Sequence, residues 1–301
     1  MTSRQLSIMM KALKRLIEEI IRKEGYNGNM MTNTFFKNSL KEKMKKRPVF
    51  GMTICSGSPA IIEMLGYGGL DFAFIDTEHN SNGVGDCREL ILAARMGNVA
   101  PLVRVGSPDE VEIRKALELG AEGVIIPHIK TVEEMEACVR GAKFPPLGRR
   151  GLDFGVRSAG YGLREYENSD YISYSNDTEL VIPMMEDFEF TARMDELMAV
   201  PGIDAINFGP ADYANSLALR TGYSTDEPQV YDALQKLRAY CESKGIGIMA
   251  PANPPTLESA MDLIHKGATM IIMSSDFNIW SASVRSIREE IGKVLKAQAQ
   301  K

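Results

Sequence analysis

The 301-residue chain is poor in cysteine, and its four cysteines form no C-x-x-C pair and have no histidine at the spacing of a zinc site. This pattern favours reduced, mostly buried thiols over a structural zinc centre. The chain also lacks a run of about 18 apolar residues, which argues against a membrane-spanning helix. Its N-terminus carries lysines but neither the apolar segment nor the cleavage site of a secretory signal. Together these absences predict a cytoplasmic protein.

An excess of positive charge is also missing. The formal net charge is −5, which argues against nucleic acid or an anionic membrane as the main partner, since neither would find a broad basic surface. The apolar fraction of 44% and the charged fraction of 25% are ordinary for a globular domain. The composition therefore allows a large core and favours a small-molecule partner.

From residue 48 onward, short β-rich apolar runs alternate with amphipathic helical stretches, which is typical of repeated βα units and a parallel sheet. No G-x-G-x-x-G motif follows the first strand, so a doubly wound dinucleotide-binding sheet is disfavoured. Eight strands, each followed by a helix, predict a (β/α)8 TIM barrel. The predicted strands are 49–54, 71–75, 101–105, 123–126, 180–185, 203–208, 246–250 and 269–273, and the predicted helices are 58–67, 86–96, 109–119, 131–141, 188–198, 228–243, 256–265 and 279–297.

Two segments stand apart from this rhythm. Residues 1–45 are predicted to be an N-terminal helical extension, with helices at 8–23 and 33–45, preceding a catalytic barrel at 46–301. The basic run at its end favours a solvated face over a binding patch. The connection 142–179 is long for a compact domain, which leaves open an active-site role or a surface and subunit-contact role.

Ionisable side chains follow several of the predicted strands. Asp76, Arg104, His128, Glu186 and Asp212 all stand at or just after the carboxyl end of a strand. In a TIM barrel these ends form one face, and catalytic groups lie there. Because such groups are costly to bury unless they are paired, protonated or bound to metal, their gathering at one face predicts an enzyme.

Glu186 and Asp212 follow neighbouring strands and would enter the same barrel mouth. Two carboxylates repel each other unless a cation lies between them, and all-oxygen ligands suit Mg²⁺ or Mn²⁺. Open positions on such a cation would accept the keto and carboxylate oxygens of a 2-oxo acid and stabilise an enolate. The alternative interpretation is that either carboxylate caps the helix after its strand.

His79, Asp76 and Arg104 are the candidate catalytic residues. His79 follows a strand end and has a side chain suited to proton transfer near neutral pH, while Asp76 is placed to orient it. Arg104 interrupts an apolar strand and would serve a developing negative charge on oxygen. A histidine packed in a loop and an ion pair of Arg104 with Glu78 or Asp76 are the competing interpretations.

Other residues are candidates for binding the substrate. The turn from Gly209 through Pro210 and Ala211 to Asp212 would offer backbone N–H groups to a carboxylate. His128 would shape the pocket or serve a structural role. No strand interior carries a lysine, and this weakens the case for a Schiff-base mechanism.

The chain resembles the HpcH/HpaI aldolases over residues 49 to about 290. The resemblance rests on the motifs GLDFAFIDTEHN, PLVRV, GAEGVIIPHI, FPPLGRRG, GPADY, IMAP and SSDF, in the family's order. It implies a class II aldolase that cleaves a 4-hydroxy-2-oxo acid to pyruvate, or a similar 2-oxo acid, and an aldehyde. The implied cofactor is a divalent cation, Mg²⁺, Mn²⁺ or Co²⁺, and the implied assembly is a homo-oligomer, a hexamer that exchanges the last barrel helix.

By the same resemblance, His79 matches the catalytic base and Asp76 its partner. Arg104 matches the arginine on the keto oxygen, Glu186 and Asp212 match the metal ligands, and Ala211 and Asp212 match the turn that holds the carboxylate. Three departures stand out, and they concern the residues that surround this set. Thr77 replaces a glycine, Met184 replaces a glutamine, and Tyr213 replaces a leucine.

The departures Thr77 and Tyr213 predict an altered aldehyde pocket, while Met184 removes a polar group near the metal ligands. Two rival functions stay open at this point. One is a 2-oxo acid decarboxylase of the oxaloacetate type that uses the same site. The other is a barrel that binds a ligand without catalysis.

Overall fold

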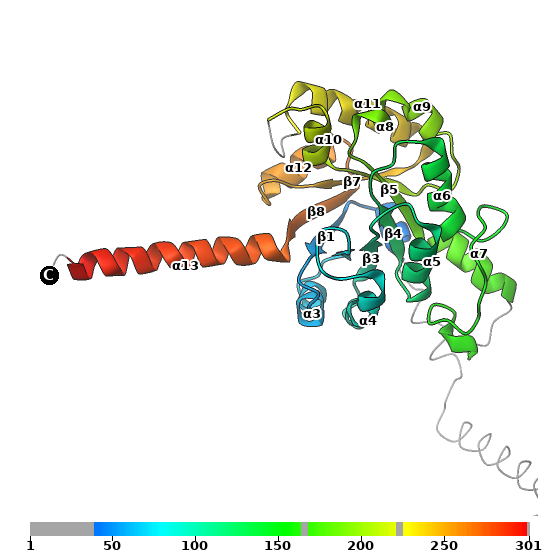
Figure 1. The fold of residues 1–301 in the computed structure, drawn as a ribbon, viewed down its shortest axis with the longest axis horizontal. Coiled ribbons are helices and arrows are strands. Elements are labelled where there is room, and N and C mark those ends of the chain that lie inside the picture. The colour runs from blue at the N-terminus through cyan, green and yellow to red at the C-terminus, as the bar shows by residue number, and fades with distance from the viewer. Residues whose placement is uncertain (1–38, 164–167, 221–224, 300–301) are drawn as a thin grey trace, which may run out of the picture. The chain divides into compact units, whose positions relative to one another are not determined.

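Eight parallel strands close into a barrel in sequence order, as Figure 1 shows. The computed structural model describes residues 39–163, 168–220 and 225–299, and the barrel lies within the unit Ser39–Lys301. The TIM-barrel prediction is confirmed, and every predicted strand end lies within two residues of the observed one. The strands are β1 Val49–Ile54, β2 Phe72–Asp76, β3 Ala100–Arg104, β4 Gly123–Ile126, β5 Leu180–Met185, β6 Ala205–Phe208, β7 Gly247–Pro251 and β8 Met270–Ser275.

Helices follow the strands at the predicted places, with some differences. The predicted helix 188–198 is broken at Arg193, and α7 and α10 were not predicted. The predicted helix 8–23 lies outside the described residues, and so does the first part of helix 33–45. The division of the chain at residue 45 stays a prediction. The helices are α2 Leu40–Met44, α3 Pro59–Tyr67, η2 Val84–Asp86, α4 Cys87–Met96, α5 Glu110–Glu118, α6 Val132–Ala142, η3 Gly160–Gly162, α7 Asn168–Thr178, α8 Phe188–Ala192, α9 Met194–Leu197, α10 Pro210–Ser216, α11 Pro228–Lys244, α12 Leu257–His265 and α13 Asp276–Ala299.

Alternate residues of each strand point into the barrel and fill it with apolar side chains. Gly51 makes room in this interior, because a Cβ there would lie 2.3 Å from the Phe72 ring. The alternation continues to the carboxyl ends of the strands, where the next inward positions hold charged groups instead. The interior cluster includes Val49, Phe72, Phe74, Leu102, Ile125, Leu180, Ile182, Met184, Met249, Met270 and Ile272.

The opposite end of the barrel is closed by α2 and by a rim of carboxylates. Leu40 of α2 is 1% exposed and belongs to the interior cluster. Four acidic residues each stand immediately before a strand, and each makes an ion pair. These acids are Asp71, Glu122, Glu179 and Asp204, paired in that order with Arg47, Arg95, Arg150 and Lys41.

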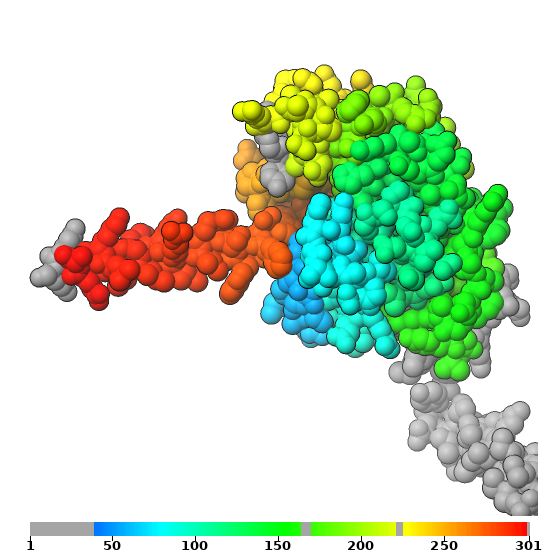
Figure 2. Space-filling model, viewed as in Figure 1, coloured from blue at the N-terminus to red at the C-terminus, as the bar shows by residue number. Residues whose placement is uncertain are grey.

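Helix α13 continues from β8 and extends away from the barrel (Figures 1 and 2). Among its residues only Asp276 is buried. No helix in the described part of the chain has the length and apolar character needed to cross a membrane. The outer faces of β1 and β8, which an eighth helix usually covers in such a barrel, carry the partly buried Phe50 and Met273.

Candidate active site

Asp76 and Arg104 face each other at the carboxyl ends of β2 and β3, where they are partners in the strand register. The Arg104 Nε donates a hydrogen bond of 2.7 Å to Asp76 Oδ1, and both residues are buried. Burial by itself raises the pKa of Asp76, but the hydrogen bond and charge of Arg104 outweigh it and hold the pKa below its usual value. The pair is therefore ionised on both sides and fixes the guanidinium in the barrel mouth.

Glu78 is a second carboxylate on the same guanidinium. Arg104 Nη1 lies 2.8 Å from Glu78 Oε2, without the alignment of a hydrogen bond. The backbone N–H of Glu78 donates to Asp76 Oδ1 at 3.0 Å, so the two acids hold their positions together. Glu78 also lies near two imidazoles, at 3.6 Å from His79 and 3.4 Å from His128.

His79 lies at the edge of the mouth with 62% of its side chain exposed. Its Nε2 approaches Glu78, and no hydrogen bond joins it to Asp76 within the described residues. Asp76 is engaged by Arg104 and by the Glu78 amide instead. The structure thus brings the proposed base and its predicted partner to the same mouth but does not pair them directly.

Glu186 stands directly after β5, and Gly209 stands directly after the paired strand β6. A Cβ on residue 209 would lie 3.0 Å from the Glu186 Cβ and 3.1 Å from its Oε2, so a side chain there would press against Glu186. The pKa of Glu186 is raised to about 7, mainly by burial and further by the negative charges of Glu78 and Asp212. The hydrogen bond from the His128 N–H lowers this pKa but does not offset the increase. This carboxyl needs either a proton or a cation nearby.

Asp212 belongs to the first turn of α10, which begins at Pro210 after the cap residue Gly209. Its charge reaches Glu186, as the raised pKa of Glu186 shows. Ala211 is half-buried at the mouth, and Asp212 is exposed. The predicted turn is therefore the start of a helix, a conformation that also directs backbone N–H groups outward.

His128 adopts a left-handed backbone conformation, with a φ of 56°, just after β4. Its backbone N–H donates to Glu186 Oε1 at 2.8 Å, and its Nδ1 lies 2.9 Å from Asp187 Oδ2. Burial alone lowers the pKa of the imidazole, but the hydrogen bond with Asp187 and the charges of Glu186 and Asp187 raise it above its usual value. Asp187 also binds Lys130, at 3.2 Å, and makes no side-chain cap on α8.

The three departures from the family pattern lie behind the mouth. The Thr77 hydroxyl donates to the backbone carbonyl of Arg104 at 2.6 Å. Met184 is 4% exposed in the barrel interior, and Tyr213 is 4% exposed with its ring 5.9 Å from that of Phe208. Tyr213 lies in the apolar layer between barrel and helices.

Glu78, Asp187 and Asp276 are the polar strand-end residues to which sequence reasoning gave no role. Asp276 accepts hydrogen bonds from the Cys55 and Ser56 N–H groups at 3.0 Å each, which ties the end of β8 to the end of β1. The available signal was their position, since all three lie just after the carboxyl end of a strand. The sequence did not show with which hydrogen-bond or ion-pair partner each of these three carboxylates interacts.

The strand-end cluster, defined as Asp76, Glu78, Arg104, His128 and Glu186, offers oxygen ligands from neighbouring strands. Among the described residues, no group of three or more His, Cys, Asp or Glu side chains is arranged so that it could hold a metal ion. One layer below, the Oδ1 of Asn207 is buried without a hydrogen-bond partner in the described part of the chain.

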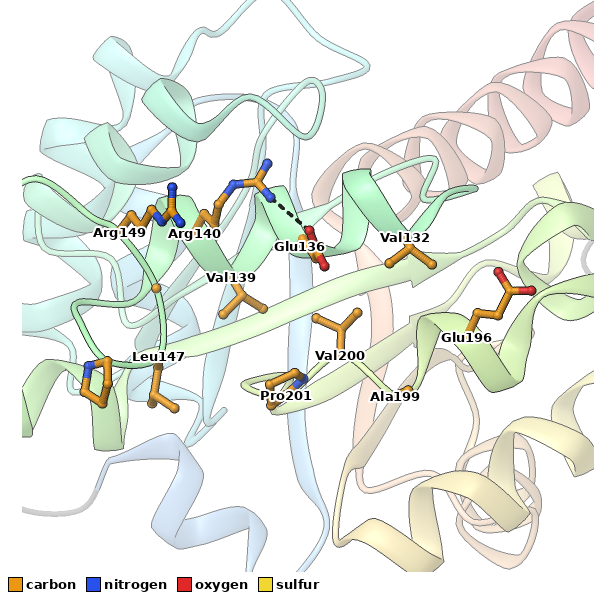
Figure 3. Close-up of a pocket in the computed structure, with 12 residues that line it drawn as sticks. Val132, Glu136, Val139, Arg140, Leu147, Arg149, Glu196, Ala199, Val200 and Pro201 are labelled. Carbon is orange, nitrogen blue, oxygen red and sulfur yellow. Dashed lines mark hydrogen bonds and ion pairs between the residues drawn. The ribbon is translucent and has the colours of Figure 1, made fainter.

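A surface groove of about 470 Å³ lies elsewhere, between α6, the segment 146–149 and the connection 199–201 (Figure 3). Its lining mixes apolar and charged side chains, among them Arg140, which pairs with Glu136 at 3.3 Å. No member of the strand-end cluster lines this groove. The groove is therefore separate from the candidate site at the barrel mouth.

Fold and site together define an α/β-barrel enzyme with a carboxylate-rich mouth. Residues 50–279 match the HpcH/HpaI aldolase/citrate lyase family, and the chain belongs to this family. The chain is accordingly an enzyme of the lyase class.

Individual relatives agree with this assignment. A 5-keto-4-deoxy-D-glucarate aldolase of Escherichia coli O6:H1 (strain CFT073) is 29% identical over 87% of this chain and 100% of its own length. The HpcH/HpaI aldolase from Desulfitobacterium hafniense DCB-2 superimposes with a TM-score of 0.76 at 26% identity, over 84% of this chain and 96% of that one. The citrate synthase SbnG does so with a TM-score of 0.72 at 29% identity, over 84% and 98%.

Proposed function

We propose that this protein is a divalent-metal-dependent class II aldolase that cleaves a 4-hydroxy-2-oxo acid to pyruvate, or a similar 2-oxo acid, and an aldehyde. The observation that carries the proposal is the pairing of Glu186 and Asp212 with a buried, carboxylate-held Arg104 at one barrel mouth. The relatives named as aldolases support the reaction class. The proposed location is the cytoplasm.

Glu186 and Asp212 fit a hard divalent cation, Mg²⁺, Mn²⁺ or Co²⁺. Their oxygens are the ligand type such ions prefer, and no donor among the described residues occupies Glu186 Oε2. Burial raises the pKa of Glu186, and the charges of Glu78 and Asp212 raise it further, so a bound cation would stabilise its ionised form. A bound cation supplies Lewis-acid stabilisation of the negative charge that develops on the substrate.

Arg104 and His79 are proposed to take part directly in cleavage of the carbon–carbon bond. Arg104 donates to the substrate keto oxygen, held in place by Asp76 and Glu78. His79 accepts the proton of the C4 hydroxyl, the C3–C4 bond breaks, and its electron pair passes to the C2–C3 unit as the aldehyde leaves. A proton delivered to C3 completes the 2-oxo acid product.

The turn and its neighbours are proposed to bind the rest of the substrate. The N–H groups of Ala211 and Asp212, placed by Gly209 and Pro210, hold the carboxylate. Thr77 and Tyr213 act on the aldehyde pocket through the backbone and packing they contact. His128 projects from β4 beside Glu186 and faces the same space.

We also propose that the protein is a homo-oligomer, a hexamer by its resemblance to the family. Helix α13 carries a stripe of exposed apolar residues, and the outer faces of β1 and β8 keep partly buried apolar side chains. A second copy's α13 in that space would cover both surfaces. The stripe consists of Phe277, Trp280, Val284, Ile287, Ile291, Val294 and Leu295.

Release of pyruvate from a 4-hydroxy-2-oxo acid, coupled to lactate dehydrogenase, tests the reaction. We expect turnover with Mg²⁺, Mn²⁺ or Co²⁺, none with EDTA, and recovery when metal is restored. A panel of aldehydes run in the synthetic direction then defines the acceptor. Turnover of oxaloacetate with no aldol reaction on any aldehyde would instead favour the decarboxylase.

A further inference from the structure

The His128 ring lies in the barrel mouth in a fixed orientation. Its backbone N–H is held by Glu186 at 2.8 Å, and its Nδ1 is held by Asp187 at 2.9 Å. Asp187 is itself anchored by Lys130. The side chain stays 49% exposed although both of these contacts restrain it. A polar side chain that is held in one orientation and is still accessible can recognise a substrate group by hydrogen bonding.

The backbone of His128 also adopts an uncommon conformation. A φ of 56° is uncommon outside glycine, although Asn, Asp and His adopt it more often than other residues. Such conformations persist where surrounding contacts impose them, and they gather at functional sites. Here the left-handed turn brings the imidazole beside Glu186 and Glu78 rather than letting it continue along the chain.

The free end of the ring faces the mouth. The Nε2 atom lies 3.4 Å from Glu78 Oε1 and makes no hydrogen bond within the described residues. Glu78 in turn contacts Arg104, the residue assigned to the keto oxygen. A substrate group that hydrogen-bonds to Nε2 would therefore lie beside the keto oxygen held by Arg104. We place the aldehyde-derived half of the substrate there.

The charges around this position restrict what that group can be. Carboxylates of Glu78 and Asp187 flank the ring, and the nearby cations are already engaged, Arg104 by Asp76 and Glu78 and Lys130 by Asp187. A second anion would be repelled by the flanking carboxylates. A neutral hydroxyl group can hydrogen-bond to the imidazole and to a carboxylate oxygen without that penalty.

We propose that His128 is a specificity-determining residue that selects acceptor aldehydes carrying a neutral hydroxyl group next to the carbonyl. The inference rests on the proposed aldolase function and names its acceptor class. It predicts that the physiological substrate is a hydroxylated 2-oxo acid whose aldehyde half carries no carboxylate of its own.

Three acceptors of similar size separate the possibilities in aldol addition to pyruvate: glycolaldehyde, propanal and glyoxylate. Glycolaldehyde and propanal differ by a hydroxyl in place of a methyl group, and glyoxylate is an anion. We expect the wild-type protein to favour glycolaldehyde over propanal in kcat/KM by about tenfold or more, as a hydrogen bond to a polar group allows. Glyoxylate is expected to be the poorer polar acceptor.

His128→Met removes the hydrogen-bonding ring atoms while keeping a long side chain. We expect the glycolaldehyde-to-propanal ratio to fall about tenfold in this variant, and His128→Gln to keep most of it. His265→Met is the matched control, since it makes the same substitution at an exposed histidine at the end of α12, outside the strand-end cluster, and should keep the wild-type ratio. In each variant, kcat/KM for glycolaldehyde is divided by kcat/KM for propanal. An overall loss of activity therefore does not change the ratio.

An unchanged ratio in His128→Met, or a wild-type preference for glyoxylate, would overturn the inference. An equal fall in the ratio for His265→Met would do so as well, because the effect would then not depend on the position of His128. If the wild-type protein adds pyruvate to none of the three aldehydes and does not exchange the methyl protons of pyruvate, the proposed function has failed instead. The two failures are therefore distinguishable.

Discussion

At the scale of single residues, the site depends on how one guanidinium is shared between two carboxylates. Asp76 takes the Nε of Arg104, and Glu78 lies against its Nη1. A charge-assisted bond between two buried groups restricts the guanidinium far more than an exposed ion pair would. The orientation of Arg104 toward the substrate is therefore set by residues that need not touch the substrate.

Asp76→Asn tests this positioning role. The amide keeps the size of the side chain but loses the charge, so Arg104 is held less firmly, and we expect kcat/KM to fall by about 10- to 100-fold. Asp71 at the other end of β2 provides the matched control, since it pairs with Arg47 away from the mouth. Asp71→Asn should lower stability and leave kcat/KM near the wild-type value, and equal kinetic losses in both variants would contradict the assignment.

The raised pKa of Glu186 predicts a pH dependence of stability in the metal-free protein. The folded-state pKa is about 7, above the ordinary value of 4.5, so the folded protein holds a proton that the unfolded chain has released. The stabilisation of the folded state by this proton is fully present below pH 4.5 and is lost as the pH rises through 7. The loss between pH 5 and pH 8 should amount to about 2–3 kcal/mol.

Urea unfolding in EDTA at pH 5 and pH 8 measures this difference. Glu186→Gln does not titrate, and we expect it to lose the corresponding part of the pH dependence. The same pH dependence in the variant and in the wild-type protein would show that other groups cause it. The comparison uses the slope with pH, so a constant offset in stability between the two proteins does not matter.

Much of this site can be predicted from the sequence because the barrel makes residue position informative. Asp76, Arg104 and Glu186 occupy inward positions at strand ends, so alternation along each strand and the common face of the barrel bring them together. The ion pair of Arg104 with Asp76 or Glu78 stood among the alternatives, and the structure shows both contacts. Asp76 binds Arg104 rather than His79, because inward side chains of adjacent strands are closer than two residues around a turn.

At the scale of elements, the short helix α2 completes the barrel from below. Leu40 fills the lowest layer of the interior, and Lys41 and Arg47 reach the rim carboxylates Asp204 and Asp71. The basic run that the sequence assigned to a solvated face is therefore partly used to neutralise acids at the strand starts. Ion pairs of this kind matter most where one partner is buried, as Asp71 is.

Leu40→Ala measures the contribution of this helix. Leu40 is 1% exposed, and removing its side chain leaves a cavity at the end of the barrel interior. We expect a loss of about 2–5 kcal/mol in the free energy of unfolding, read from denaturant titration. Leu163→Ala is the matched control because Leu163 is 86% exposed and should change stability little. A loss below about 0.5 kcal/mol for Leu40→Ala would show that α2 is not part of the core.

Element prediction failed where local sequence and tertiary contacts disagree. The sequence of α7, NSDYISYSNDT, is rich in residues that favour turns, and the helix is held by contacts such as Tyr171 against Phe144. α10 begins at a Gly-Pro pair that indicates a turn, yet proline is well suited to the first helical position. The strands were predictable since their long apolar runs leave few alternatives.

At the scale of the whole molecule, α13 exposes an apolar stripe along much of its length. Trp280 is 70% exposed and Ile287 57% exposed. Contiguous apolar surface of this kind marks an interface in most proteins. The opposite face of the helix carries polar and small residues, so the two faces can be tested separately.

Ile287→Asp introduces a charge into the stripe, and we expect it to reduce the oligomer to smaller species in size-exclusion chromatography with light scattering. The reason is that an unpaired carboxylate is costly to bury in an apolar interface. Ala282→Asp places the same charge on the exposed opposite face and should keep the wild-type mass. A monomeric wild-type protein, or equal masses for both variants, would contradict the proposed assembly.

The central claim, that a divalent cation held by Glu186 and Asp212 drives enolate chemistry, is tested most directly by the exchange of pyruvate methyl protons. Pyruvate is incubated with the purified protein in deuterated water, and loss of the methyl signal is followed by NMR. We predict exchange with Mg²⁺, Mn²⁺ or Co²⁺, none after EDTA treatment, and a near-complete loss in Glu186→Gln. Exchange that continues unchanged in that variant, or after complete removal of metal, would contradict the account.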